Sequence, residues 1–265
     1  MPILHIIVLA LVQGLTEFLP VSSAAHLILG GRVFGWQDQG LVFDLATHVG
    51  TLLAALFFFR RELLGMLQSC TAPVRDEAGR QNRSMVYFLA AASLPALALG
   101  AAAHELVEYL LRDLRVIAIT TTVFGLVLWW ADVAGGKQRE LPGMNLRSAV
   151  IIGLAQALAL VPGVSRSGIT ITAGRFLGYS PDAASRFSFL LSIPITAAAG
   201  AYGALRVATG EASIDWGVFG LAVLFSAVAG WLCIAAFLAL LRRVGLLPFV
   251  IYRLLLGAVL LYVIL

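Results

Sequence analysis

Two short polar stretches interrupt the apolar runs of this 265-residue chain, and they hold its candidates for chemistry. The polar side chains of the first stretch, on either side of Pro20, are Gln13, Glu17, Ser22, Ser23 and His26. Those of the second stretch, which follows Pro162-Gly163, are Ser165, Arg166, Ser167 and Thr170. A carboxylate, an imidazole and a guanidinium beside several hydroxyls predict a site that binds phosphate.

The predicted phosphate donors act in different ways. The guanidinium of Arg166 can bind two phosphate oxygens through its planar fork. The hydroxyls of Ser22, Ser165, Ser167 and Thr170 are further donors, as are the backbone amides of a helix that begins after each proline. We therefore predict that these five residues bind the substrate.

The first stretch also predicts a metal site and a proton carrier. Gln13 and Glu17 are four residues apart and share one face of a helix. We expect them to hold a hard divalent cation that bridges two phosphates, Mg²⁺ or alternatively Ca²⁺. His26 is expected to move a proton, and Ser23 either to attack phosphorus or to bind it.

Each of these residues has a structural interpretation as well. Charged side chains are costly inside a membrane, and Glu17 and Arg166 can lie there as an ion pair that joins the two stretches. His26 can be a hydrogen-bonded buried histidine. The hydroxyls can bond carbonyl groups that are freed where the helices bend.

The composition indicates that the chain lies in a membrane. Hydrophobic residues make up 60% of it and charged residues 12%, with a mean hydropathy of +0.95. Soluble domains carry about 25% charged residues. This difference excludes an ordinary soluble enzyme, a disordered chain and a nucleic-acid-binding module, and it predicts an all-helical polytopic membrane protein.

The apolar runs divide the chain into eight segments, 3–31, 41–59, 85–103, 114–131, 148–178, 183–206, 216–241 and 246–265. Six are long and uniform enough for transmembrane helices. The runs 3–31 and 148–178 contain the two polar stretches and their prolines. Because proline breaks a helix, each is predicted to be a re-entrant helical hairpin.

The order of these segments indicates an internal duplication within one membrane domain, residues 1–265. Residues 1–132 and 148–265 each contain one broken segment followed by three spans. An odd number of spans inverts the second copy, so we predict inverted-topology repeats whose broken tips meet near the middle of the bilayer.

Loop charges predict the orientation in the membrane. Basic residues gather in the loops 60–83, 137–147 and 242–243, which lie on one side if both broken segments re-enter. The intervening loops hold fewer cations and carry Glu105, Glu108, Asp113, Glu211 and Asp215. The basic side is therefore expected to be cytoplasmic, with both termini outside.

The stretches 13–26 (QGLTEFLPVSSAAH) and 162–170 (PGVSRSGIT) resemble the two signatures of bacterial undecaprenyl-diphosphate phosphatases of the bacitracin-resistance type. Residues 43–44, 48–51 and 186–194 also resemble stretches of this family, so the resemblance covers essentially the whole chain. Two positions depart from the commonest pattern: Gln13 stands where a second glutamate is frequent, and Ala25 stands where glycine is usual.

The resemblance implies a hydrolase of the bacterial cytoplasmic membrane that acts at the outer face. Such an enzyme removes the terminal phosphate of undecaprenyl diphosphate, recycles the lipid carrier for cell-wall synthesis and gives bacitracin resistance. By position in the motifs, Glu17 and Gln13 correspond to the acidic pair near the metal, His26 to the catalytic histidine, Ser23 to the nucleophile and Arg166 to the phosphate-binding arginine.

A lipid-phosphate flippase or secondary transporter is the alternative function, because broken helices that meet at mid-membrane are typical of transporters. The combination of serine, histidine, glutamate and arginine exceeds what binding alone requires and favours the hydrolase. Expected partners are the lipid diphosphate and membrane lipids. The 26 glycines allow close helix crossings within one chain or in a homodimer, and the sequence does not choose between them.

Overall fold

The computed structural model describes residues 2–36, 40–74, 76–110, 113–136, 138–210 and 214–264. The side chains at 32–33 and 103–110 are outside this description. Of the charged residues used for the orientation argument, Arg75, Lys137, Glu105, Glu108 and Glu211 lie outside the described residues or side chains.

The described residues form helices and contain no β-strand. The helices are α1 (Ile3–Phe18), α2 (Ser23–Phe34), α3 (Gly40–Phe58), α4 (Arg60–Thr71), α5 (Glu77–Leu110), α6 (Leu114–Ala134), η1 (Leu141–Gly143), α7 (Leu146–Gln156), η2 (Ala157–Leu160), α8 (Arg166–Phe176), α9 (Pro181–Ala208), α10 (Trp216–Val244) and α11 (Leu247–Ile264). The predicted all-helical fold is confirmed.

Six of these helices, α3, α5, α6, α9, α10 and α11, are long and apolar enough to cross a membrane. Each contains at least 18 residues, close to the length that spans the hydrocarbon layer. Large apolar side chains such as Trp130, Leu205 and Leu255 lie exposed on their outer surfaces, as expected where lipid replaces water. The chain is therefore a multi-pass membrane protein with the predicted six spans.

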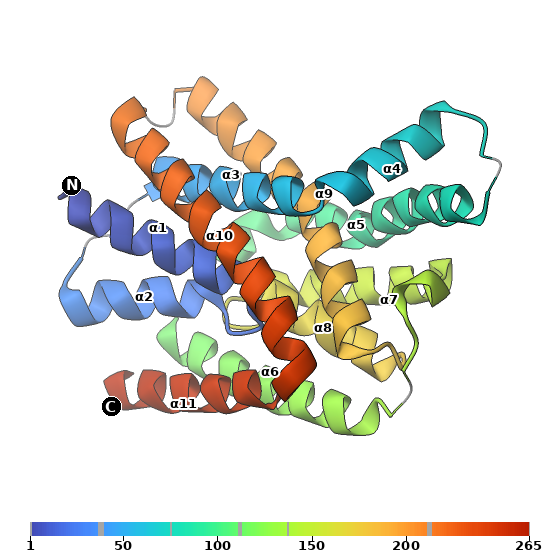
Figure 1. Cartoon of the computed structure of the whole chain (residues 1–265). Coiled ribbons are helices and arrows are strands. Elements are labelled where there is room, and N and C mark those ends of the chain that lie inside the picture. The colour runs from blue at the N-terminus through green and yellow to red at the C-terminus, as the bar shows by residue number, and fades with distance from the viewer. Residues whose placement is uncertain are drawn as a thin grey trace.

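The two predicted breaks lie between α1 and α2 and between η2 and α8. Each follows a shorter apolar helical segment, Ile3–Phe18 or Leu146–Leu160, and contains a proline. In Figure 1, α1 and α2 run side by side from the end of the molecule that carries both chain termini, and their connection lies in the interior. The two breaks are in contact, because the Ser167 hydroxyl donates to the Leu19 carbonyl at 2.8 Å.

The prediction of one long loop over residues 60–83 is wrong. Residues Arg60–Thr71 form α4, and α5 begins at Glu77 rather than near residue 85. The α4 helix is amphipathic and too polar to stand out as an apolar run. Arg83 holds α5 to the end of α4, with Nε donating to the Ser69 carbonyl at 2.7 Å. A hydropathy profile does not show such a contact between two helices.

Close packing against α10 fixes the position of α1. Gly14 lies against α10 so tightly that a β-carbon would come within 2.6 Å of the Ser226 carbonyl oxygen and 2.7 Å of the Ala229 side chain. Small residues allow such approaches between membrane helices. Because Glu17 lies one helical turn after Gly14, this crossing also places the carboxylate.

Candidate active site

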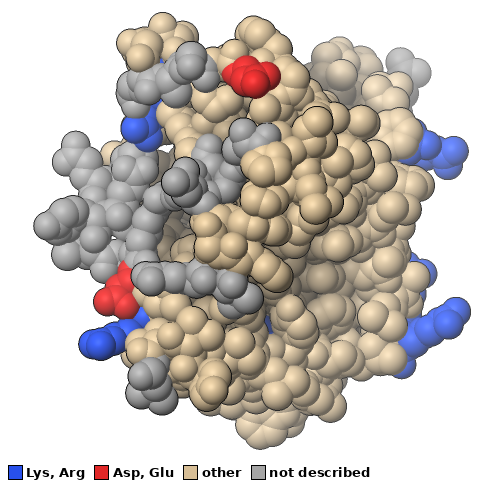
Figure 2. Space-filling view, turned by 90° about the vertical axis from the view of Figure 1, so that its left-hand side faces the viewer, with Lys and Arg blue, Asp and Glu red and all other residues tan. Residues whose placement is uncertain are grey.

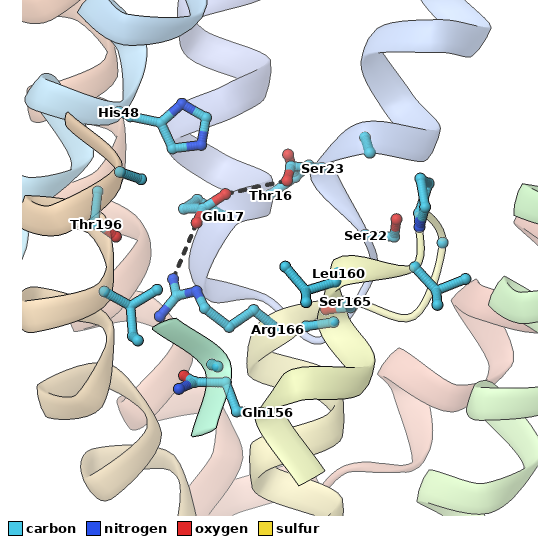
Figure 3. Close-up of a pocket in the computed structure, with 18 residues that line it drawn as sticks. Thr16, Glu17, Ser22, Ser23, His48, Gln156, Leu160, Ser165, Arg166 and Thr196 are labelled. Carbon is cyan, nitrogen blue, oxygen red and sulfur yellow. Dashed lines mark hydrogen bonds and ion pairs between the residues drawn. The ribbon is translucent and has the colours of Figure 1, made fainter. Parts of the chain in front are cut away.

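A cavity of about 250 Å³ lies where the two breaks meet. Its lining comes from both breaks and from α3, α5 and α9, and Figure 3 draws these residues. The polar side chains in the lining are Thr16, Glu17, Ser22, Ser23, His48, Gln156, Ser165, Arg166 and Thr196. The structure thus brings together the two polar stretches, which are more than 130 residues apart in the chain.

Glu17 is the centre of a hydrogen-bonded network in this cavity. Its Oε1 atom accepts from Arg166 Nη2 at 3.0 Å, across the two breaks. Its Oε2 atom accepts from Gln13 Nε2 at 3.0 Å and from Ser23 Oγ at 3.1 Å. Figure 3 shows the contacts with Arg166 and Ser23 as dashed lines. Four predicted site residues therefore form one cluster.

The ion pair is largely but not completely buried. The Arg166 and Glu17 side chains are 14% and 10% exposed. Each charge compensates the other, so the pair avoids the cost of an isolated buried charge. Their remaining exposure is directed to the cavity, where an anionic ligand can compete with Glu17 for the guanidinium.

Ser22 and Ser165 begin the helices that follow the breaks. Their φ angles are 74° and 70°, in a region that residues other than glycine rarely adopt. The Ser22 hydroxyl accepts from the Ala25 amide, and the Ser165 hydroxyl accepts from the Gly168 amide. The N-terminal ends of α2 and α8 therefore both lie at the cavity, where helix dipoles favour an anion.

Ser167 and Thr170, also predicted to bind substrate, are 1% exposed and do not line the cavity. Besides its bond to Leu19, the Ser167 hydroxyl lies 3.2 Å from that of Ser165. Thr170 Oγ1 donates to the Arg166 carbonyl at 2.8 Å and lies 2.6 Å from Ser188 Oγ. These contacts match the structural interpretation, in which hydroxyls bond groups freed at the breaks.

His26 lies on the first turn of α2 and is not among the cavity-lining residues. Its Nδ1 atom is 2.7 Å from the Ser22 carbonyl, and its Nε2 atom is 2.6 Å from the Tyr252 hydroxyl of α11. Since the carbonyl can only accept, Nδ1 carries the proton and Nε2 of the neutral ring accepts from Tyr252. His26 thus links the start of α2 to α11.

A second imidazole, that of His48 on α3, does line the cavity. Figure 3 shows its ring beside Glu17. Its Nδ1 atom is 2.7 Å from the Asp44 carbonyl, which can only accept, so Nδ1 is the donor in this contact. Sequence reasoning did not assign His48 to the site, because nothing local in the sequence shows that α3 places this residue beside Glu17 of α1.

Sequence reasoning missed Arg253, which is fully buried on α11. Its guanidinium donates to four backbone carbonyls, those of Thr121 at 3.1 Å, Pro20 at 3.2 Å, Val164 at 3.0 Å and Gly163 at 2.9 Å. It therefore ties the first break to the second. A charge within a transmembrane run was the signal that could have identified it.

The donor set at Glu17 fits a cation that binds together with a diphosphate. The described residues contain no group of three His, Cys, Asp or Glu side chains that could hold a metal alone. Mg²⁺ is commonly held by one or two carboxylates plus substrate phosphates. Glu17 supplies one carboxylate. Gln13 directs its amide nitrogen to Glu17, and rotation of the amide group by 180° would direct its oxygen, a cation ligand, to the same place.

Comparisons with known proteins agree with this geometry. A family model described as bacitracin resistance protein BacA matches residues 6–259. The chain is 51% identical over 258 residues to an undecaprenyl-diphosphatase of Chromohalobacter salexigens, which covers 97% of both proteins. It is 50% identical over 264 residues to one of Teredinibacter turnerae, which covers 98% of both, and 50% identical to one of Colwellia psychrerythraea over the full length of both. This chain belongs to the BacA family of bacitracin resistance proteins.

Proposed function

We propose that this protein hydrolyses undecaprenyl diphosphate to undecaprenyl phosphate and inorganic phosphate, and so recycles the lipid carrier of cell-wall synthesis. The names of the full-length relatives support this function. The observation that carries it is the Glu17–Arg166 ion pair across the two breaks, with Ser23 bound to the same carboxylate. A flippase or transporter is not favoured, because binding alone does not need a hydroxyl held by a carboxylate.

The cavity suits the diphosphate rather than the whole lipid. Its volume of about 250 Å³ is below that of pockets that enclose drug-sized ligands, about 300 to 1,000 Å³. In the proposed complex, Arg166 and the N-terminal ends of α2 and α8 bind phosphate oxygens. The polyprenyl tail remains along the apolar surface of the helices, in the bilayer.

The proposed reaction transfers the terminal phosphoryl group to an oxygen held near Ser23. In the covalent route, Ser23 Oγ bonds to the terminal phosphorus, its proton passes to a histidine, and the bond to the bridging oxygen breaks. The electron pair leaves with undecaprenyl phosphate, and water then hydrolyses the phosphoserine. In the direct route, Ser23 positions the water that attacks. Arg166 stabilises the charge that develops on the phosphoryl oxygens in either route.

A histidine is proposed to take the proton of Ser23 or of the attacking water. His26 holds the position of the catalytic histidine in the signature, and its ring is bonded to the carbonyl of Ser22, the residue before Ser23. His48 is a second candidate, because its ring lines the cavity while its Nδ1 atom is bonded to the Asp44 carbonyl. The kcat values of His26→Ala and His48→Ala distinguish these two assignments.

Gln13 and Glu17 are the residues proposed to hold a divalent cation. When Arg166 exchanges Glu17 for phosphate, one carboxylate oxygen becomes available for the ion. Bound there, Mg²⁺ or Ca²⁺ would neutralise charge on the diphosphate. The single carboxylate supports binding of the cation with the substrate rather than before it.

We also propose the predicted membrane arrangement, with α1–α2 and α7–α8 as re-entrant hairpins in inverted repeats 1–132 and 148–265. The helix α4 and the start of α5, which hold Arg60, Arg61, Arg80 and Arg83, lie away from the chain termini in Figure 1, as does the start of α7, which holds Arg147. Figure 2 faces the end with the termini, where the described charged side chains are few and scattered. This difference supports a cytoplasmic basic side in the inner membrane, outer termini and a cavity that opens to the periplasm.

Phosphate release from a short-chain prenyl diphosphate in detergent tests the function. We expect wild-type protein to release one phosphate per substrate and a chelator to abolish release. Arg166→Ala, Glu17→Ala and Ser23→Ala should each lose activity, whereas Arg242→Ala, which removes an exposed ion pair with Asp182 outside the cavity, should not. Activity that survives all three cavity substitutions would contradict the assignment.

A short quench with labelled substrate separates the two routes. The covalent route predicts labelled phosphate on Ser23 in wild-type protein and none in Ser23→Ala. An unlabelled, fully active enzyme would support direct attack by water.

A further inference from the structure

Gln156, the last residue of α7, has a buried side chain amide with no hydrogen-bond partner among the described residues. The residue is 2% exposed, and neither Nε2 nor Oε1 makes a hydrogen bond. It nevertheless lines the cavity, where Figure 3 places it on the opposite side of Arg166 from Glu17. Buried polar groups are almost always paired, so an unpaired amide beside a cavity calls for a partner.

The first break shows what this amide lacks. Gln13 and Gln156 each stand nine residues before the serine with positive φ, Ser22 in one break and Ser165 in the other. Gln13 donates to the Glu17 carboxylate one turn further along. The residue at the equivalent place in the second break is Leu160, which has no acceptor in its side chain. The same glutamine therefore has an anionic partner in the first break and none in the second.

The missing partner is best supplied by the ligand. Charge-assisted hydrogen bonds from an amide to an oxyanion are among the stronger ones, and the cavity already contains Arg166 and two helix N-terminal ends that favour an anion. A diphosphate carries oxygens on two phosphorus atoms, so it can reach beyond Arg166. The carboxylate of Glu17 interacts with Gln13, Ser23 and Arg166 and does not fill this role.

We infer that Gln156 is a substrate-binding residue whose Nε2 donates to a non-bridging oxygen of the bound diphosphate. This inference rests on the proposed function, and it adds to the site a contact that the two signature stretches do not contain. Gln156 binds and does not react, so it is expected to act on the affinity for diphosphate more than on the chemical step.

The test compares Gln156→Leu, which removes the amide at similar size, with Gln156→Glu, which replaces it by an anion of the same shape. Ser185→Ala is the matched control, because the Ser185 hydroxyl is also buried without a hydrogen-bond partner in the described part of the chain but does not line the cavity. Binding of methylenediphosphonate, a diphosphate that cannot be hydrolysed, is measured by calorimetry, and KM and kcat are measured with a short-chain prenyl diphosphate.

We expect Gln156→Leu to weaken diphosphonate binding and raise KM about tenfold or more, with a smaller change in kcat. Gln156→Glu should weaken binding further, through repulsion. Ser185→Ala should bind as wild type does. The melting temperature without ligand should not fall in Gln156→Leu, because the change removes an unpaired buried amide.

Wild-type affinity in both Gln156→Leu and Gln156→Glu would overturn the inference. If Gln156→Leu does not fold, Gln156→Met supplies the same comparison with a flexible side chain of similar length. Failure of the proposed function gives a different result: wild-type protein that binds diphosphonate, weakened by Gln156→Leu, yet releases no phosphate.

Discussion

The two helix breaks, residues 19–22 and 161–165, have a similar backbone and different side chains. Each follows a short apolar segment, contains a proline and ends at a serine with positive φ that caps the next helix. The first break is flanked by Glu17 and Ser23, whereas the second is followed by Arg166. The shared parts build the cavity, and the parts that differ supply its chemistry.

This comparison teaches that neither break is a site by itself. The carboxylate and the hydroxyl lie on one side, the guanidinium lies on the other, and they meet only because the breaks are in contact. Arg253, from neither break, bonds carbonyls of both. Substitutions at the charged residues, at the contact between the breaks, at the histidines and at the shared serines test this comparison.

The largest loss of activity is expected from removing the opposite charges of the two breaks. Arg166→Gln should lower kcat/KM by about 10²- to 10³-fold, as for the loss of one group that stabilises transition-state charge. The double variant Glu17→Gln with Arg166→Gln leaves no unpaired charge, so its melting temperature should stay closer to wild type than that of Arg166→Gln alone. A folded, active double variant would reduce the pair to a structural role. Phosphate release and thermal unfolding in detergent measure both effects.

The second largest effect is expected from a substitution that separates the two breaks. Arg253→Met removes the donors to four carbonyls, and we expect it to lower the free energy of unfolding by about 4 kcal/mol, at roughly 1 kcal/mol for each lost bond. Activity should fall as well, because the breaks lose their mutual position. Arg253→Lys should recover part of the stability. Equal stability of wild type and Arg253→Met in thermal unfolding would contradict the role of Arg253.

The two histidines compare the first break, which His26 follows, with the neighbouring helix α3, which carries His48. His26→Ala is expected to lower kcat by about 10²-fold, the lower end of general acid–base contributions, and His48→Ala by less, about tenfold. Tyr252→Phe keeps the imidazole of His26 but removes its hydroxyl partner, so it should cost less than His26→Ala. A larger loss in His48→Ala than in His26→Ala would move proton transfer to His48.

The smallest effect is expected at the shared serines. Ser22→Ala and Ser165→Ala each remove a helix cap, which should cost about 1 kcal/mol of stability in both breaks alike. Ser22→Gly and Ser165→Gly lose the same cap but relieve the positive φ, so they should unfold at a higher temperature than the alanine variants. Unequal responses of the two breaks would show that their backbones are not equivalent.

The sequence predicted the six spans and both breaks because apolar length and proline act locally. It also offered an ion pair of Glu17 with Arg166 as one interpretation, since two charges within a membrane need partners or a wet cavity. It did not predict α4, because a short amphipathic helix lacks a long apolar run. It missed the position of His48 and the unpaired amide of Gln156, because both depend on which helices cross at the cavity.

Composition, run lengths and the two polar stretches by themselves determined that this chain is a helical membrane protein with a phosphate-binding chemistry. Those features follow from the transfer of apolar side chains into lipid and from the breaking of helices by proline. Both effects depend on residues that are close together in the chain. Tertiary structure alone decided that Gln13, Glu17, Ser23 and Arg166 form one cluster, that His26 binds Tyr252 and that His48 and Gln156 line the cavity. The physical reason is that close crossings such as that of α1 with α10 at Gly14, and bonds such as those of Arg253, set side-chain positions through residues distant in the chain.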